Sequence, residues 1–437
     1  MLLEFSVKNF RSIRDEQVFS MVASDEKGIS NNKVRLKKYE KISVLNSAVV
    51  YGANGSGKTN LFLAFDIFRQ LIYFSDTNGP DQRITQYMPY KLDSSGINEP
   101  TVFEIEFLDR EGTRYLYSVS FNGQEILAEK LFYYPRAKML KVFVREKGKQ
   151  IDFGNLPGSK RKIESLLGKN QLFLSKSAKS KNEFLEHVYS VLRRDFGVIK
   201  SQDHHLSPIS STVYFVRKSE KNKQIILALL QAADLSIEDI VIRKNEVDEK
   251  DFGFPEGMPS EVRDFLVENK KYEPRFKHKL YDDDGHEKGH VEFRLSEESD
   301  GTIRLFQLAS RIIEAVDHGY TLFIDEINNG LHPVLGHFIV DLFQNADANQ
   351  HNAQLIFTTH DVNFLESDLF RRDQIWFVEK NRLGKSSIYS LSEFNEDKNL
   401  TKENRKVSIR NWYLSGRFGG VPVIRDLLIK GRKDAEA

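Results

Sequence analysis

The sequence predicts an α/β protein with a doubly wound, mostly parallel sheet, an added antiparallel β-sheet and a helical lobe. Three observations predict it. Short apolar segments such as Ile42–Tyr51 alternate with helix-length segments, as in parallel sheets. Thr101–Val144 instead alternates apolar and polar residues with turn clusters between, which is typical of antiparallel strands. Lys160–Gln231 is rich in helix formers at amphipathic spacing.

The parallel part is expected from two separated stretches. Near the N-terminus, the strand Ile42–Tyr51 precedes a helix that starts at Lys58, and a further strand, with no pairing assigned, is expected at Leu2–Val7. Between Gly301 and Glu379, three helices alternate with the strands TLFIDE, QLIFTTH and QIWFVE. Alternating strands and helices favour parallel pairing.

The chain is expected to divide into five parts. These are 1–100 and 296–400 as two halves of one α/β head, 101–155 as its antiparallel subdomain, 156–295 as a helical insert with a hairpin, and 401–437 as a C-terminal partner or oligomer segment with a tail.

The amino-acid composition excludes several classes of protein and of functional site. The 437 residues include no cysteine, carry a formal charge of +1 and are 29% charged, which excludes disulfide scaffolds, thiol nucleophiles, cysteine metal sites and whole-chain disorder. No apolar run reaches membrane-spanning length, and charge follows within four residues of the start. We therefore expect no membrane association and a cytoplasmic location.

Charge is unevenly distributed. Arg136–Lys200 contains 16 Lys and Arg against 6 Asp and Glu, whereas Asp234–Asp300 contains 11 against 20. Three interpretations are open: solvated faces, a nucleic-acid track on the basic segment, or complementary lobes in an oligomer.

Gly52–Thr59 reads GANGSGKT and fits the phosphate-binding loop GxxxxGK[ST]. It follows an apolar strand and opens a helix, where backbone N–H groups and the helix N-terminus attract phosphate. Lys58 would bridge the β- and γ-phosphates, and Thr59 would hold Mg²⁺. A chance glycine turn is the alternative.

A second group of candidate site residues lies at the ends of the expected strands TLFIDE and QLIFTTH. Asp325 would hold Mg²⁺ through water, and Glu326 would orient and deprotonate the attacking water. His360 ends the next strand and could contact the γ-phosphate and this water. Helix capping for the carboxylates and a structural role for the histidine are the alternatives.

These motifs, in this order, resemble the ABC-type ATPase heads of P-loop NTPases shared by RecF, SMC and OLD-family proteins. The resemblance implies a serine–glycine signature that completes a neighbouring subunit's site, and LSEESDGTIRLFQLASRI supplies it with Ser299 and Gly301. It also places Arg11, in the opening FSVKNFRSI, near nucleotide. The residues expected to contact nucleotide are Arg11, Gly52, Asn54, Gly55, Ser56, Gly57, Lys58, Thr59, Asn60, Ser299 and Gly301.

The segments IDEINNGLHP and YLSGRFGGVP further resemble the AAA-family ATPases of bacterial anti-phage defence, of the RloA, AriA and PtuA type. That resemblance implies an ATPase using ATP and Mg²⁺ at head-to-tail interfaces of a homo-oligomer, at least a dimer. It would regulate a separately encoded effector, expected to be a nuclease, since the sequence shows no HNH motif or Toprim-like cluster. The alternatives are a RecF- or SMC-like DNA-repair ATPase that binds nucleic acid, and a nucleotide-gated scaffold, which would not need Glu326.

Several further residues have competing interpretations. Asp282, Asp283, Asp284, His286 and His290 have metal-ligand chemistry, but their D-G pair between alternating strands favours a hairpin turn. His204-His205 is expected in a loop, and His332 acts across an interface or starts a helix at Pro333. Gln86 is a weak candidate for a glutamine loop. Arg410–Val421 either anchors a partner or packs its aromatic residues on the core.

Overall fold

The computed structural model describes residues 1–25, 32–136, 138–154, 156, 160–180, 182–200, 207–232, 236–246, 267, 271–365, 369–394 and 409–421. The His204-His205 pair lies outside them. The chain forms two compact units. The loop unit comprises Leu2–Ser30, Arg35–Tyr189 and Val362–Ala437, and the carboxylate unit comprises Met1, Asn31–Val34 and Ser190–Asp361.

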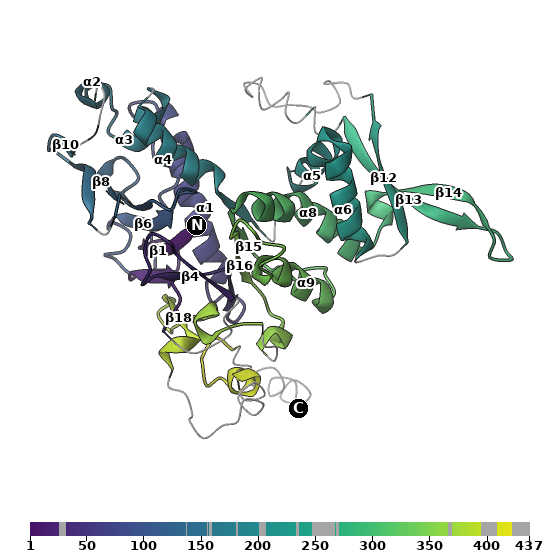
Figure 1. Cartoon of the computed structure of the whole chain (residues 1–437). Coiled ribbons are helices and arrows are strands. Elements are labelled where there is room, and N and C mark those ends of the chain that lie inside the picture. Colours follow the sequence, from purple (N-terminus) through teal and green to yellow (C-terminus); the bar gives the residue numbers. More distant parts are fainter. Residues whose placement is uncertain are drawn as a thin grey trace, which may run out of the picture. The chain divides into compact units, whose positions relative to one another are not determined.

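A seven-stranded antiparallel sheet forms one layer of the loop unit (Figure 1). Its spatial order is β10 (Asp152–Phe153), β9 (Leu140–Glu146), β8 (Ile126–Tyr134), β7 (Arg114–Phe121), β6 (Thr101–Leu108), β1 (Leu2–Lys8) and β2 (Gln17–Ser20). All neighbouring strands pair antiparallel. The predicted antiparallel sheet is confirmed, and β1 and β2 extend it beyond residues 101–155.

A second set of strands in this unit begins with β5 (Ser47–Tyr51), which is buried throughout. It pairs parallel with β17 (Ile375–Lys380), and β18 (Ser386–Ser390) pairs antiparallel with β17. The expected strand Ile42–Tyr51 is divided into β4 (Ser43–Leu45) and β5 at Asn46, and β3 (Lys33–Arg35) precedes them.

Aromatic packing joins the antiparallel sheet to the helix that follows β5. The described helices of this unit are α1 (Lys58–Phe74), α2 (Lys160–Ser165), α3 (Phe173–Lys179) and the part of α4 (Glu183–Arg194) up to Tyr189. Short 3₁₀ turns lie at Ser75–Thr77, Val362–Leu365, Arg372–Gln374 and Leu391–Glu393. The ring centroids of Phe65 and Phe68 on α1 lie 5.0 and 6.0 Å, respectively, from that of Phe5 on β1. Phe68 also meets Phe103 of β6 at 5.7 Å. This apolar contact fixes α1, and with it the loop at its N-terminus, against the sheet.

The carboxylate unit contains three parallel strands. β15 (Thr321–Ile324) lies between β11 (Phe196–Ile199) and β16 (Gln354–Thr358), and both pairs are parallel. The helices α8 (Asp300–His318) and α9 (Pro333–Gln344) precede and follow β15. The parallel strands, the added antiparallel sheet and the helices confirm the predicted α/β class.

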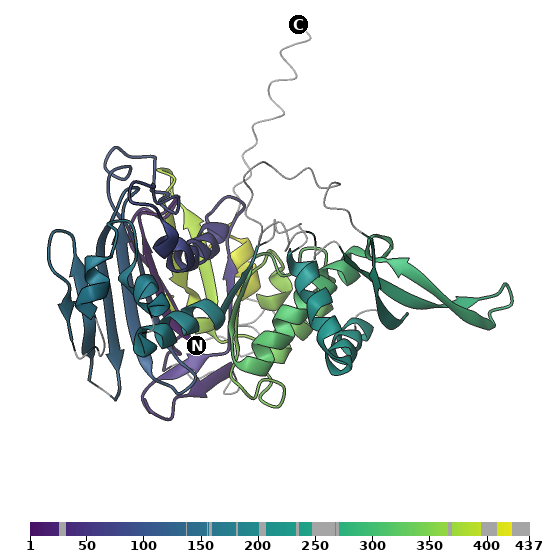
Figure 2. The ribbon, with the colours of Figure 1, turned by 90° about the horizontal axis from the view of Figure 1, so that it is seen from above.

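The rest of this unit is a helical and β-hairpin region. α5 (Ser207–Lys218) and α6 (Glu220–Gln231) contact α8, and both contact a three-stranded sheet of β12 (Ile237–Lys244), β13 (Tyr272–Tyr281) and β14 (Glu287–Arg294). The green and teal ribbons of Figure 2 show this sheet beside the three helices, with β13 and β14 extending as a long hairpin. A 3₁₀ turn, Leu295–Glu297, leads to α8. None of the described helices is both long and apolar enough to cross a membrane.

Candidate functional site

The loop Gly52–Gly57 connects buried β5 to α1, as the sequence predicts. Glycine is required at both ends. A Cβ added to Gly52 would lie 2.4 Å from the Val378 carbonyl oxygen, and one added to Gly57 would lie 2.3 Å from the Ser386 hydroxyl oxygen. Gly57 also has φ of +116°, which other residues rarely adopt. The loop is therefore a tight turn that packs against β17 and β18.

Lys58 is the first residue of α1 and is 6% exposed. Its ammonium donates to the carbonyl oxygens of Gly52 at 2.7 Å and Ala53 at 3.3 Å. The positive charge thus lies within the loop, where the sequence motif requires it. The Thr59 hydroxyl belongs to an exposed residue at the start of the same helix, so it could reach a bound ion.

A small polar cluster supports the loop from the side of β18. The Ser386 hydroxyl oxygen lies 2.5 Å from the Ser56 carbonyl oxygen and 2.8 Å from the Ser12 hydroxyl oxygen. Asn60 donates its amide to Ser12 at 2.7 Å. Sequence reasoning named Asn60 and missed Ser12 and Ser386: in the opening FSVKNFRSI only Arg11 was given a role, and Ser386 belongs to no motif. These contacts explain why residues far apart in the sequence shape one loop.

Arg11 lies next to this cluster in the chain. It has φ of +49°, its side chain is exposed, and its backbone N–H donates to the Met88 carbonyl oxygen at 2.8 Å. The neighbouring Ser12 contacts the loop cluster, whereas the Arg11 guanidinium forms no hydrogen bond or ion pair with the described loop residues. Arg11 remains a predicted nucleotide contact.

The carboxylates at the end of β15 are arranged around Thr358, the last residue of β16. The Thr358 hydroxyl donates to Asp325 Oδ1 at 2.7 Å and accepts the Glu326 backbone N–H at 2.7 Å. Asp325 is 1% exposed, and Glu326 has φ of +53°. A left-handed glutamate costs roughly 1–3 kcal/mol, and the bond to Thr358 offsets this cost. Of these two neighbouring carboxylates, that of Asp325 is therefore buried and that of Glu326 is half-buried.

Polar side chains around His360 form a second network. Thr359 donates to Asn328 Oδ1 at 2.8 Å, and the Asn328 amide donates to Asp361 at 3.3 Å. His360 itself is exposed and lies in the chain between Thr359 and Asp361, which both belong to this network. The turn after Glu326 is thereby tied to the segment that carries His360. Thr358 and Asn328 were not expected from the sequence.

The signature residues open helix α8. The Ser299 hydroxyl accepts the Thr302 backbone N–H at 3.1 Å and so caps the helix. A Cβ on Gly301 would lie 3.3 Å from the Gly330 carbonyl oxygen, and Gly330 has φ of +77°. This close approach gives a physical reason for glycine at both positions. The signature turn and the turn after Glu326 are therefore packed together within the carboxylate unit.

The acidic and histidine residues with competing interpretations have structural roles in a hairpin turn and at the start of a helix. Asp282 accepts the backbone N–H groups of Asp284 and His286 at 3.1 and 2.8 Å, and Gly285 has φ of +81°. The hairpin turn is confirmed, and the bond from His286 chiefly lowers the pKa of Asp282. His332 caps α9 by accepting the Val334 N–H at 3.3 Å, in agreement with its helix-start interpretation.

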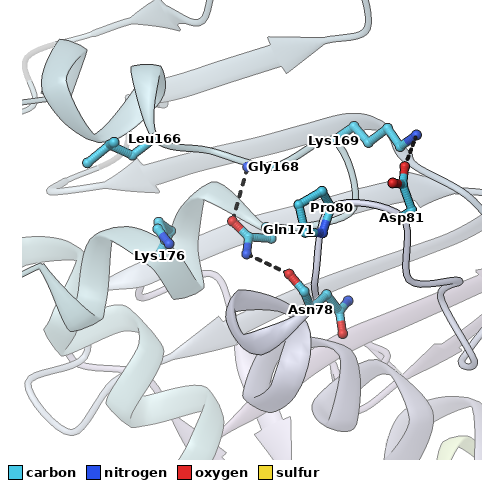
Figure 3. Close-up of a pocket in the computed structure, with 8 residues that line it drawn as sticks. All are labelled: Asn78, Pro80, Asp81, Leu166, Gly168, Lys169, Gln171 and Lys176. Carbon is cyan, nitrogen blue, oxygen red and sulfur yellow. Dashed lines mark hydrogen bonds and ion pairs between the residues drawn. The ribbon is translucent and has the colours of Figure 1, made fainter.

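A pocket of about 410 Å³ lies elsewhere in the loop unit (Figure 3). Gln171 crosses one side of it, with its amide donating to the Asn78 carbonyl oxygen at 3.0 Å, and Lys169 pairs with Asp81 at 3.6 Å. None of the predicted site residues lines this pocket. It is therefore separate from the glycine loop.

Comparison with known proteins identifies a family. Residues 47–366, almost three-quarters of the chain, match the AAA_21 family, described as "AAA domain, putative AbiEii toxin, Type IV TA system". No curated protein matches. Among solved structures, the chain is similar to one titled "Crystal structure of the SmcHead bound to the C-winged helix domain of ScpA", with TM-score 0.41 and 14% identity over 89% of this chain and 97% of that one.

Proposed function

The chain belongs to the AAA_21 family of AAA domains, and from this premise we propose that it binds and hydrolyses Mg·ATP as an ABC-type ATPase. The observation that carries the proposal is the strand–loop–helix turn at Gly52–Lys58. Gly52 and Gly57 have no room for a side chain, and Lys58 lies inside the turn. Such a loop cradles phosphate through backbone N–H groups.

The oxygen donors suit the ion that usually accompanies ATP. Mg²⁺ prefers hard oxygen ligands, and the Thr59 hydroxyl and the Asp325 carboxylate are such donors. When bound, the ion would neutralise charge on the phosphate oxygens. Glu326 would accept a proton from the attacking water, and His360 would contact the γ-phosphate. The bond from Thr358 would hold Glu326 for this task.

We further propose that two subunits complete each site head to tail. Ser299 and Gly301 would contact a γ-phosphate bound to the loop of a neighbouring subunit. Ser299 is exposed at the N-terminus of the 19-residue helix α8, and a helix N-terminus favours an anion. A homodimer is the smallest assembly that satisfies this arrangement.

For the biological role, we propose a regulatory ATPase of anti-phage defence that controls a separately encoded effector, expected to be a nuclease. The family description mentions a toxin of a toxin–antitoxin system, and such systems also act through a second component. The resemblance of YLSGRFGGVP to defence ATPases supports the same role.

A DNA-repair ATPase that acts directly on DNA is the second candidate, favoured by the basic segment Arg136–Lys200. Many of its cations have carboxylate partners within the loop unit. These pairs include Lys141–Asp152, Arg145–Glu129, Lys147–Glu125, Lys149–Glu146, Arg161–Glu164 and Lys179–Asp76. Paired cations contribute less to phosphate binding, so the structure favours the first candidate. DNA binding with a steep salt dependence would reverse this order.

The ATPase proposal is tested by turnover with Mg²⁺. Asp325→Asn should abolish hydrolysis, whereas Asp341→Asn, at an exposed position of α9, should leave it unchanged. Equal turnover by wild type and Asp325→Asn would contradict the assignment of the metal-binding carboxylate. Absence of turnover in the wild type, with ATP still bound, would favour a scaffold.

A further inference from the structure

The C-terminal segment Arg410–Val421 packs on the strand that enters the glycine loop. Tyr413 is 7% exposed, and its ring lies 5.3 Å from Tyr51, the last residue of β5, and 5.5 Å from Phe377 of β17. Phe418 is 4% exposed and stacks on Phe377 at 5.4 Å. The segment therefore has a buried aromatic face that covers the end of β5.

The Tyr413 hydroxyl connects this segment to the loop itself. It donates to the Gly420 carbonyl oxygen at 3.5 Å and accepts a backbone hydrogen bond from Gly52. Burial raises the pKa of Tyr413, and the bond from Gly52 opposes that rise. One phenol oxygen thus joins the first glycine of the loop to the end of the C-terminal segment.

The main chain of the segment approaches Gly52 as closely as the side chain does. A Cβ on Gly420 would lie 3.4 Å from the Gly52 Cα and 3.5 Å from the Val378 carbonyl oxygen, and Gly420 has φ of +69°. Two residues earlier, the carbonyl oxygen of Phe418 accepts the Tyr389 hydroxyl at 2.6 Å. A Cβ at position 420 would thus be in van der Waals contact with the loop, so a side chain longer than a methyl group would press on it.

We infer that Tyr413 and Gly420 are positioning residues for nucleotide binding, acting through Gly52. This inference rests on the proposed function. The Gly52 carbonyl oxygen accepts the Lys58 ammonium at 2.7 Å, so a displaced Gly52 displaces the lysine that the phosphates require. Small displacements of positioned groups weaken binding and catalysis strongly. The chain thereby couples its C-terminal segment to its phosphate loop.

Two glycine variants separate this contact from general backbone strain. Gly416 has φ of +79°, close to that of Gly420, but a Cβ there would meet nothing within 4 Å. Titration of the full chain with a fluorescent Mg·ATP analogue should show affinity at least about fivefold weaker for Gly420→Leu, because its side chain extends beyond the Cβ that already contacts Gly52. Gly416→Leu should bind like the wild type. Equal affinities for both variants would overturn the inference.

Tyr413→Phe tests the hydroxyl while keeping the ring stacked on Tyr51. Loss of one hydrogen bond predicts about three- to tenfold weaker binding of the analogue. Tyr214→Phe is the control, because Tyr214 is 68% exposed in the carboxylate unit. Thermal melting of both variants checks that the fold is kept.

Hydrogen exchange of the nucleotide-free protein distinguishes this inference from the proposed function. Tyr413→Phe should increase exchange at the Gly52 amide, and Gly416→Leu should not. If the wild type fails to bind the analogue, the proposed function is wrong while exchange still tests the contact. Unchanged Gly52 exchange in Tyr413→Phe overturns the positioning role, whatever the affinities.

Discussion

The Lys58 ammonium donates to the Gly52 carbonyl oxygen over 2.7 Å, so the side chain that should bind phosphate is held by the loop's own backbone. A cation in this position preserves the shape of the turn without nucleotide. Phosphate binding would replace these bonds from an ammonium to neutral carbonyls with bonds between opposite charges.

Lys58→Ala should abolish binding of Mg·ATP, because it removes the cation at the centre of the loop. Calorimetric titration measures the loss directly. Lys149→Ala is the control, since the Lys149 side chain is 71% exposed and pairs with Glu146. Tight binding by Lys58→Ala would show that nucleotide does not bind at this loop.

Thr358→Val should lower both stability and turnover. The substitution keeps the shape of the side chain but removes the hydroxyl shared by Asp325 and the Glu326 N–H. An unsatisfied buried partner costs about 1–3 kcal/mol, and Glu326 loses the bond that holds its left-handed backbone. Thermal melting and ATPase assays measure the two effects. Thr85→Val, at an exposed position, should change neither, and unaltered turnover in Thr358→Val would remove Thr358 from the site.

Ser299→Asp tests completion of the site by a second subunit. Aspartate can still cap α8, but its charge would repel a γ-phosphate, so ATPase activity should fall while stability remains. Mixed dimers of Ser299→Asp and Lys58→Ala subunits contain one site with both halves intact, and we expect partial recovery of activity.

The matched control is a mixed dimer of Lys58→Ala and Glu326→Gln subunits. In a head-to-tail dimer neither of its sites has both the lysine and the glutamate, so activity should stay absent. Recovery in this control, or none in the first mixture, would contradict trans completion.

Glu129 predicts a pH dependence of stability in the loop unit. Its carboxylate is fully buried on β8, accepts the Phe173 and Leu174 N–H groups at 2.7 and 2.9 Å, and lies 3.5 Å from Arg145. Burial raises the pKa of Glu129 despite these partners. Because the folded protein holds this proton more tightly, the stabilisation is complete below the ordinary glutamate range and is lost as pH rises through the raised pKa.

The thermal midpoint of Glu129→Gln should therefore change less than that of the wild type as pH rises from about 4 upward. Glutamine keeps one acceptor oxygen of the two and does not ionise. A midpoint that follows the wild-type profile over this range would show that Glu129 does not titrate as burial predicts.

Local sequence patterns predicted most of the secondary structure and the positions of the principal motifs. Alternation in Thr101–Val144 predicted its strands, and the glycine loop predicted its own position between β5 and α1. The contacts that shape the site lie beyond such patterns. Ser386 reaches Ser56 across 330 residues, and a serine at a strand start carries no periodic signal.

The C-terminal segment shows a different limit. Its aromatic residues were compatible with packing on the core or with anchoring a partner, because composition alone does not say which face is covered. Burial of Tyr413 and Phe418 supports the packing interpretation, while Leu414 and Arg417 are exposed. Similarly, the buried Asn46 divides the single strand that was expected, and one asparagine in a segment of otherwise high β propensity does not predict such a break.

Glu326→Gln tests the central claim most directly, because it removes the proposed base while keeping the shape of the side chain. Calorimetry and single-turnover hydrolysis of Mg·ATP should be measured on the same preparation. We predict wild-type affinity, with the rate of hydrolysis lower by about 100-fold or more. Wild-type turnover by Glu326→Gln would contradict the account.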